Sequence, residues 1–342
     1  MKKRSQLFIA LIALTIITST CMMAQKVGST SMQFFKVMPV ARANAMGDAY
    51  TVLGRGAEAI FWNPAGVAYT QGTELSMTYL QWIFDTQQGA MSISRSFRGF
   101  GSLGIQLQYI DYGEIEEAVW GDPYKNDLNT PGLTGRTFRP YSYVVGISYA
   151  TKITDKFSTG LGVKYARESL YDKDEIVVVS DASDTAKVKT WGEDVLFDYG
   201  IHYLTGFRSI ELAASVQNFG PNIKYAKENH PTPMIFRIGI AANFIGPDAL
   251  LLKNEKNRMG VEFDLIHPND YDQQIHVGLE YEFSKLVALR CGYKFNYDAE
   301  GLTAGLGLKQ DIGGMRLAFD YSFASLKYHL GNVQRISLGV GF

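Results

Sequence analysis

The chain ends in the stretch Arg335-Ile336-Ser337-Leu338-Gly339-Val340-Gly341-Phe342, in which apolar residues alternate with small or polar ones. A period of two is typical of a β-strand whose two faces meet different environments. Here one face carries aliphatic and aromatic side chains, and the other carries serine and glycine. Strands of this kind build membrane β-barrels, in which lipid lies outside and water or a plug lies inside.

The same alternation recurs along most of the chain and predicts fourteen strands. The predicted strands cover residues 73–83, 88–97, 101–110, 138–149, 157–167, 193–203, 208–217, 234–244, 257–265, 273–283, 286–296, 301–309, 314–323 and 332–342. An even number is the rule for bacterial single-chain barrels. We therefore expect an all-β fold, in which residues 73–342 form a transmembrane antiparallel β-barrel.

The lengths of the connections follow the outer-membrane pattern, in which long loops face outward and short turns face the periplasm. The three longest connections, 111–137, 168–192 and 218–233, all follow odd-numbered strands and so share one side. Most connections on the other side are tight, and 245–256 is the exception. The sequence therefore predicts a protein of the Gram-negative outer membrane, surrounded by outer-membrane lipid.

The N-terminus is typical of an exported protein. A basic start, residues 1–4, precedes an apolar run over residues 7–17, which is too short to anchor the chain in a membrane. We expect a signal peptide over residues 1–24, cleaved after Ala24; the alternative is a lipoprotein signal that uses Cys21. Without the signal peptide only Cys291 remains, so no disulfide can form within the chain.

Charged residues share the polar face of several predicted strands. A charge that faces lipid near the bilayer midplane costs about 2–4 kcal/mol, so these faces must point into the lumen. The candidates for a polar network in the lumen are Glu262, Asp264, Glu280, Arg290, Lys294, Arg316 and Asp320. We expect them to pair with one another or with a plug, and a polar path for a solute is the alternative.

A plug is predicted from the segment before the first strand. Residues 25–72 are rich in alanine and glycine and show little alternation, which favours short helices and turns. Its tetrapeptide Asn63, Pro64, Ala65 and Gly66 has the composition of a tight turn. Glycines repeat at every second position on the polar faces of several strands, where they let another backbone approach closely. We expect this segment to pack inside the barrel.

The usual signatures of enzymes are absent from the sequence. It contains no G-x-S-x-G, no H-E-x-x-H and no glycine-rich phosphate loop, and its five histidines are scattered. Asn269, Asp270 and Asp272 could bind a metal, but a solvated loop is the preferred interpretation. The net charge of −1 gives no basic excess for nucleic acid. We expect no catalysis, no cofactor and no metal.

Three blocks of sequence resemble the PorV/PorQ family, which is related to the FadL-type fatty-acid transporters. The blocks are residues 41–49 with 62–66, residues 215–225 with 231–239, and residues 277–281 with 288–293 and 305–307. The chain departs from the family at Asp48, where members often have a second glycine after the first. The resemblance implies a fourteen-stranded barrel with an N-terminal plug.

The resemblance also implies a function in type IX secretion. PorV-like members receive secreted cargo through its C-terminal domain, and PorQ-like members anchor the surface attachment complex. The chain would then bind such proteins through its extracellular loops, which carry aromatic residues among acidic ones. The candidate partner-binding residues are Glu114, Glu116, Glu117, Trp120, Tyr124, Tyr171 and Trp191, and simple solvated loops are the alternative.

Transport is the competing function that the resemblance leaves open. A FadL-like barrel would carry long-chain fatty acids or other hydrophobic compounds across the outer membrane. An apolar pocket beside the plug, lined by residues such as Phe61 and Trp62, would support it.

Overall fold

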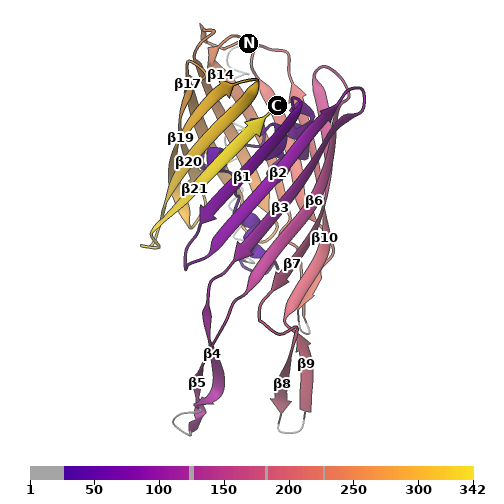
Figure 1. The fold of residues 1–342 in the computed structure, drawn as a ribbon, viewed down its shortest axis with the longest axis vertical. Coiled ribbons are helices and arrows are strands. Elements are labelled where there is room, and N and C mark those ends of the chain that lie inside the picture. The colour runs from indigo at the N-terminus through magenta and orange to yellow at the C-terminus, as the bar shows by residue number, and fades with distance from the viewer. Residues whose placement is uncertain (1–26, 123–126, 182–183, 226–227) are drawn as a thin grey trace, which may run out of the picture.

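A computed structural model of the chain describes residues 27–122, 127–181, 184–225 and 228–342, so the predicted signal peptide lies outside the described residues. Within them, fourteen antiparallel strands close into a barrel (Figure 1), and each predicted strand overlaps one of them. The barrel strands are β1 (Thr73–Gln81), β2 (Gln87–Phe97), β3 (Gly101–Asp111), β6 (Tyr141–Lys152), β7 (Phe157–Ser169), β10 (Trp191–Leu204), β11 (Glu211–Phe219), β14 (Ile235–Gly246), β16 (Arg258–Pro268), β17 (Gln274–Phe283), β18 (Val287–Phe295), β19 (Glu300–Ile312), β20 (Met315–Leu326) and β21 (Asn332–Gly341).

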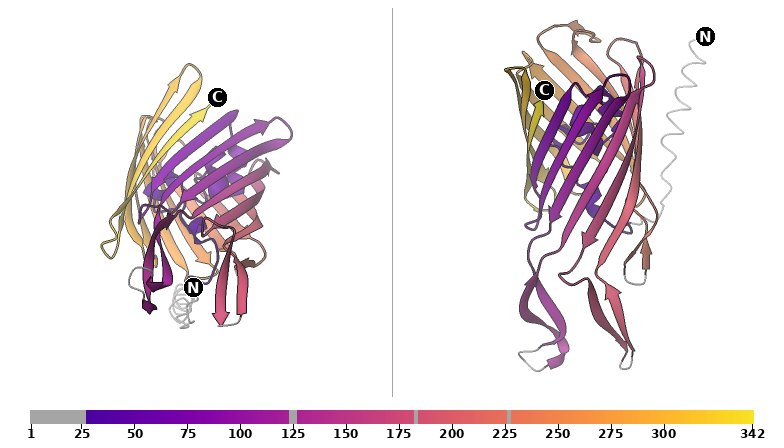
Figure 2. Two further views of the ribbon diagram at one scale, coloured as in Figure 1. Left: turned by 60° about the horizontal axis from the view of Figure 1, so that its bottom comes forward. Right: turned by 45° about the vertical axis from the view of Figure 1, so that its right-hand side comes forward.

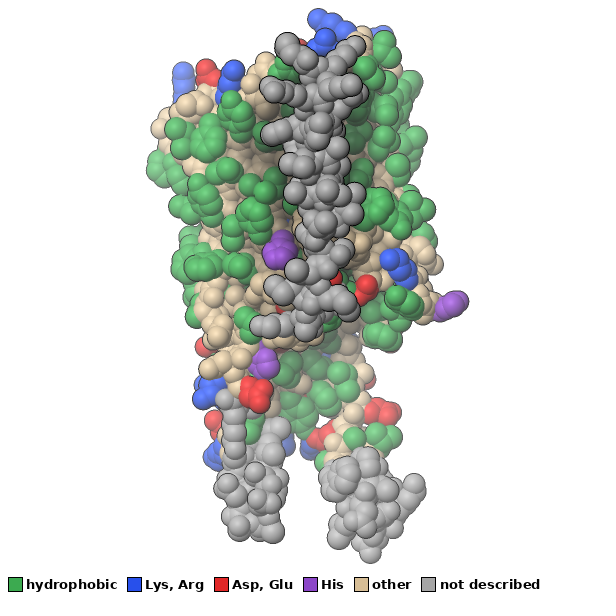
Figure 3. Space-filling model, turned by 180° about the vertical axis from the view of Figure 1, so that it is seen from behind, with side chains coloured by type: hydrophobic (Ala, Val, Ile, Leu, Met, Phe, Trp, Pro, Cys, Tyr) green, Lys and Arg blue, Asp and Glu red, His purple; other side chains and the backbone are tan. Residues whose placement is uncertain are grey.

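The barrel closes because its first and last strands pair. β1 lies between β2 and β21, and β11 pairs with β14 across the third long connection. Along β18, Arg290 and Lys294 are buried on the inner face, while Leu289 and Tyr293 are exposed on the outer face. Hydrophobic side chains cover much of the barrel wall (Figure 3), as a lipid-facing surface requires. In the described part of the chain, no helix is both long and apolar enough to span a membrane.

The three long connections, which the sequence predicts as loops, contain hairpins. They are formed by β4 (Ile115–Asp122) with β5 (Asp127–Phe138), β8 (Glu175–Asp181) with β9 (Asp184–Lys189), and β12 (Ile223–Tyr225) with β13 (Glu228–His230). The first two project well beyond the barrel rim (Figures 1 and 2). We call this end of the barrel the loop end and the opposite end the turn end. At the turn end, the long connection after β14 holds β15 (Leu252–Lys253), which pairs in parallel with β14.

The N-terminal segment runs through the lumen from the loop end to the turn end (Figure 2). At the loop end, the Ser31 N–H donates to the Pro231 carbonyl, and at the turn end Thr73 pairs with Phe342. Its short helices are η1 (Gln33–Lys36), α2 (Ala41–Ala45), η2 (Gly56–Phe61) and η3 (Pro64–Tyr69). Trp62 is fully buried and contacts Tyr50 edge to face, with ring centroids 5.5 Å apart. These aromatic rings give the lumen an apolar core.

Glycine on the inner face of the barrel lets this segment lie directly against the wall. A Cβ added to Gly292 of β18 would lie 2.1 Å from the amide nitrogen of Gly47, and one on Gly160 of β7 would lie 2.4 Å from the carbonyl carbon of Pro64. No side chain fits at such distances. The wall glycines therefore serve backbone contact in the lumen, as the sequence pattern suggested.

Candidate functional site

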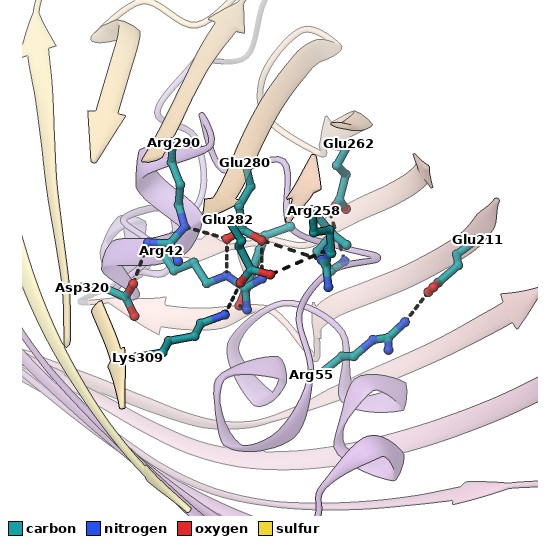
Figure 4. A network of polar contacts seen from close by, with 12 residues as sticks. Arg42, Arg55, Glu211, Arg258, Glu262, Glu280, Glu282, Arg290, Lys309 and Asp320 are labelled. Carbon is teal, nitrogen blue, oxygen red and sulfur yellow. Dashed lines mark hydrogen bonds and ion pairs between the residues drawn. The ribbon is translucent and has the colours of Figure 1, made fainter. Parts of the chain in front are cut away.

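The centre of the lumen holds a network of buried charges around Glu280 (Figure 4). Arg42 of α2 reaches both carboxylate oxygens of Glu280 at 2.8 Å, and Arg290 Nε lies 2.6 Å from it. Arg290 also donates through Nη1 to Asp320 of β20 at 2.5 Å. The side chains of Glu280 and Arg290 are almost completely buried. Burial of charge is tolerable here because each member contacts a charge of opposite sign.

Two further carboxylates hold the backbone of the N-terminal segment. Glu262 accepts hydrogen bonds from the N–H groups of Val52 (2.6 Å) and Leu53 (3.0 Å). Asp264 accepts from the N–H groups of Tyr50 (3.0 Å) and Thr51 (3.1 Å), and from the Thr51 hydroxyl (2.6 Å). Both carboxylates project from β16 and both residues are fully buried. We call residues 50–53 with these two side chains the carboxylate clamp.

A third buried cluster surrounds Lys294 of β18. Its ammonium group contacts the carboxylates of Asp48, in the N-terminal segment, and Glu300, at the start of β19. Glu300 also lies 3.7 Å from Arg335 of β21. This cluster joins three strands to the N-terminal segment, and Asn44 of α2 adds a hydrogen bond to Glu300 at 3.4 Å, so it ties the segment to the wall.

Six of the seven predicted lumen residues are therefore buried within these three clusters. The seventh, Arg316, shares their inner face but lies at the turn end, where its side chain is 48% exposed and 3.3 Å from Glu74. Sequence reasoning did not assign Arg42, Asp48 or Glu300 to the network. A charged side chain on an alternating strand can be assigned to the lumen. Arg42 and Asp48 lie in a segment without alternation, so the sequence does not indicate the direction in which their side chains point.

The predicted turn motif anchors the turn-end half of the segment. The Asn63 side chain accepts from the Ala65 N–H at 3.0 Å and caps η3, whose first residue is Pro64. Through its Nδ2, the same side chain donates to the carbonyls of Thr51 (3.2 Å) and Ile201 (3.1 Å). Gly66 is buried beside Ala65. Asn63 thus links two parts of the segment to the barrel wall.

At the loop end, residues 27–38 form a strap that lies across the mouth and is held by Asp270. The Asp270 carboxylate accepts from the Thr30 hydroxyl at 2.7 Å and from Gln33 Nε2 at 3.0 Å, and it pairs with Lys36 at 2.5 Å. Asp270 is 2% exposed. The interpretation of its loop as solvated was therefore wrong at this residue, because the strap covers it.

The two projecting hairpins meet at their bases. The Glu117 carboxylate of β4 accepts from Arg136 of β5 at 2.7 Å and from the hydroxyl of Tyr171, which lies before β8. The Tyr171 ring also packs on Phe138, with centroids 4.8 Å apart. We call Glu117, Arg136 and Tyr171 the hairpin brace. Two of its members were predicted as partner-binding residues, but here they bind each other.

The remaining predicted loop residues fall into three groups. Glu114 and Glu116 are exposed near the start of β4. Trp191 is half-buried at the start of β10, where Arg167 and Lys189 lie over its ring at 4.3 Å and 4.5 Å. Tyr124 and the side chain of Trp120 lie outside the described residues. Of the predicted loop residues whose side chains the structure describes, Glu114 and Glu116 are therefore the exposed ones that can meet another molecule.

The hairpin brace should respond to acid. Hydrogen bonds from Arg136, Thr134 and Tyr171 lower the pKa of Glu117 from 4.5 to about 2. A lowered pKa means that the brace is complete above about pH 4.5 and is lost as the pH falls toward about 2. We expect spin labels at positions 116 and 187, in a Cys291→Ser background, to keep a narrow distance distribution down to about pH 4 and to broaden below it.

An Arg136→Gln variant is the control, because it removes the first of these donors. Its distance distribution should already be broad at neutral pH and should change little in acid. Equal acid responses of the two proteins would show that Glu117 does not hold the hairpins together.

The closed antiparallel wall, the charged lumen and the segment that crosses it are together the architecture of a FadL-like outer-membrane barrel. The toluene transporter TbuX of Ralstonia pickettii is similar in fold, with a TM-score of 0.55 and 14% identity over 90% of this chain and 98% of that chain. The toluene transporter TodX of Pseudomonas putida gives a TM-score of 0.55 and 12% identity, over 87% and 95% of the two chains. A FadL homologue of Pseudomonas aeruginosa gives 0.51 and 12%, over 89% and 98%.

The family follows from the sequence itself. The family model of the type IX secretion system protein PorV matches residues 21–269, which is most of the chain. The chain therefore belongs to the PorV family and resides in the outer membrane. No curated protein matches it.

Proposed function

We propose that this protein is a non-enzymatic binding protein of the type IX secretion pathway, which holds, shuttles or anchors secreted proteins or components of the machinery at the loop end. The loop end faces the cell exterior if the chain follows the usual outer-membrane pattern of long loops outside and short turns inside. Membership of the PorV family supports the pathway. The main structural support for binding at the loop end is the pair of projecting hairpins, β4–β5 and β8–β9.

The hairpins suit this role because contacts among their described residues fix their bases while their strands project beyond the barrel rim. The brace joins β4–β5 to Tyr171, and Arg139 continues it with an ion pair to Asp111 at 3.1 Å and a backbone N–H bond to Asp172 at 3.1 Å. A binding element that is already ordered loses less entropy on binding than a flexible loop. The free strand edges of the hairpins also offer backbone hydrogen bonds to an extended partner.

Passage of hydrophobic compounds through the lumen has less support. Trp62 is fully buried against Tyr50, and Phe61 borders a cavity of only about 10 Å³. That volume is about the least that one water molecule needs. The apolar pocket that would support transport is therefore not formed beside these two residues. We accordingly place the function at the loop end and not in the lumen.

Excision of the first hairpin tests this proposal. Replacing residues 118–135 with a short Gly-Ser linker should reduce recovery of type IX secretion proteins with the tagged barrel by about tenfold or more, since a few central contacts supply most of the binding energy of an interface. The measurement is a mild-detergent pull-down from native outer membranes, quantified by mass spectrometry. The matched control replaces residues 248–254 at the turn end and should keep full recovery.

An equal loss in both variants would point to a general folding defect. Full recovery in the hairpin variant, with a folded barrel, would contradict binding through this hairpin.

A further inference from the structure

An apolar cavity at the loop end lies beside the root of the first hairpin. It encloses about 280 Å³ between the strap, the β1–β2 turn and the end of β3. Its apolar walls come from Phe34, Val37, Trp82, Ile83, Phe84 and Ile110. A cavity of about 150 Å³ with such walls can hold a benzene ring. This one has room for an aromatic or a long aliphatic side chain.

The chemistry of the lining restricts the occupant. Polar lining residues such as Gln33, Thr86 and Tyr112 are uncharged, and among the described residues no Asp, Glu, Lys, Arg or His contributes to the walls. A ligand that carries a carboxylate would leave that charge unpaired on binding, which is unfavourable. The part of the occupant that fills the cavity must therefore be uncharged and apolar.

Phe84 marks the entrance. Its side chain is 78% exposed, and its backbone is left-handed with φ of +53°, followed by Asp85 with φ of +59°. A bulky residue adopts this conformation rarely and at a cost. Despite this conformational cost, the turn holds an exposed aromatic ring beside an open apolar cavity. Exposed apolar surface of this kind is typical of a recognition surface.

The cavity is continuous with the base of the first hairpin. Tyr112 lines it and stands three residues before β4, and its hydroxyl lies 3.1 Å from the Ser142 hydroxyl. A Cβ added at Gly113 would lie 3.5 Å from the Cβ of Asp85, so the β1–β2 turn packs against the hairpin root. A protein held by β4–β5 would lie over this cavity.

Below the strap, the two cavities described are small. The adjoining cavity, which shares Val37 as a wall, encloses about 10 Å³. A second cavity under the strap, bordered by Lys36 and Met38, encloses about 30 Å³. Neither has room for an organic ligand, so the geometry favours a group that enters from the loop end and stays there.

We propose that this cavity receives one large apolar side chain of the protein that the hairpins hold, and that Phe84 packs against the same partner. This inference rests on the proposed function, because the occupant belongs to the captured protein. Central apolar anchors in pockets commonly dominate the energy of an interface. The hairpins would then provide area and orientation, and the cavity would provide the anchor.

Photo-crosslinking identifies the occupant directly. Phe84→p-benzoylphenylalanine is irradiated in native outer membranes, and crosslinked peptides are sequenced by mass spectrometry. We expect a crosslink to an aromatic or aliphatic residue in one segment of the protein that the hairpins capture. Phe207→p-benzoylphenylalanine, at an exposed position in a turn-end connection, is the matched control and should give no such crosslink.

Filling the cavity supplies the second readout. Ile83→Trp should lower recovery of the same protein by about tenfold, as expected for loss of an anchor. Thr86→Phe fills the cavity from another wall and serves if the first variant fails to fold, with heat-modifiable gel migration as the folding check. Ile147→Trp, on the exposed outer face of β6, should have no effect.

Three results would overturn the inference. Crosslinks to lipid alone would assign the cavity to the membrane. Undiminished capture by both filled variants would leave hairpin binding intact but remove the anchor. Failure of the hairpin excision to reduce capture, with no protein crosslinked at position 84, would reject the proposed function and the anchor together.

Discussion

Replacing Arg290 with methionine is expected to lower the free energy of unfolding by about 3–5 kcal/mol, the usual cost of removing one partner from a buried ion pair. Arg290 is fully buried and contacts Glu280 at 2.6 Å and Asp320 at 2.5 Å. Methionine fills much of the same space but offers no charge and no N–H donor. Glu280 would keep Arg42, whereas Asp320 would lose the cation that it contacts.

The measurement is urea unfolding in lipid vesicles, followed by tryptophan fluorescence. Arg316→Met is the matched control, since Arg316 lies on the same inner face but its side chain is 48% exposed beside Glu74. An exposed pair of this kind contributes about 0–1 kcal/mol, so the control should unfold almost as the parent does. Equal stability of the two variants would mean that water reaches Arg290 and that the centre of the lumen is not dry.

Every barrel strand could be predicted from the sequence because lipid imposes a strict rule. The outer face of each strand must be apolar, and the inner face is free of that demand, so alternation marks each strand by itself. The two faces of β18, with Leu289 outside and Arg290 inside, needed no knowledge of the neighbouring strands. Strand pairing then followed from chain order, because consecutive antiparallel strands are neighbours.

The partners inside the lumen could not be predicted in the same way. The alternation predicts that Arg290 and Arg316 face the lumen. It does not predict whether each residue lies at the centre of the barrel or near one end. Arg316 and Asp320 are four residues apart on β20, which is about 13 Å of strand, and this distance separates the exposed end from the buried centre. The cross-lumen pair of Arg42 with Glu280 joins residues 238 positions apart, so only the folded register reveals it.

Outside the membrane the alternation rule no longer applies. The strands β4, β5, β8 and β9 pair within their own hairpins and lie beyond the barrel wall, so no lipid requirement imposes a two-sided pattern on their sequences. The strap was missed for a related reason. Its hold on Asp270 depends on short polar contacts from Thr30, Gln33 and Lys36, and none of these has a sequence signature.

The carboxylate clamp should decide whether the N-terminal segment stays in place. In a Glu262→Ala/Asp264→Ala variant, four backbone N–H groups and the Thr51 hydroxyl lose their acceptors. A buried N–H group that is left without an acceptor costs about 1–3 kcal/mol. Loss of two acceptors therefore corresponds to a fall of at least about thirtyfold in amide protection, because about 1.4 kcal/mol is a factor of ten.

Hydrogen exchange with mass spectrometry measures this loss at residues 50–53, with peptides from β2 as the internal reference for an intact barrel. The matched control is Glu262→Gln/Asp264→Asn, which keeps one acceptor oxygen at each position and replaces the other oxygen with an amide nitrogen. We expect the control to retain most of the protection, since the amide oxygens can still accept from Val52 and Thr51. The clamp binds the segment midway between the strap and Asn63. Its loss should free this part of the segment from the wall and so raise single-channel conductance in planar bilayers. Unchanged exchange and unchanged conductance in the alanine variant would show that the charge clusters around Arg42 and Lys294 hold the segment without the clamp.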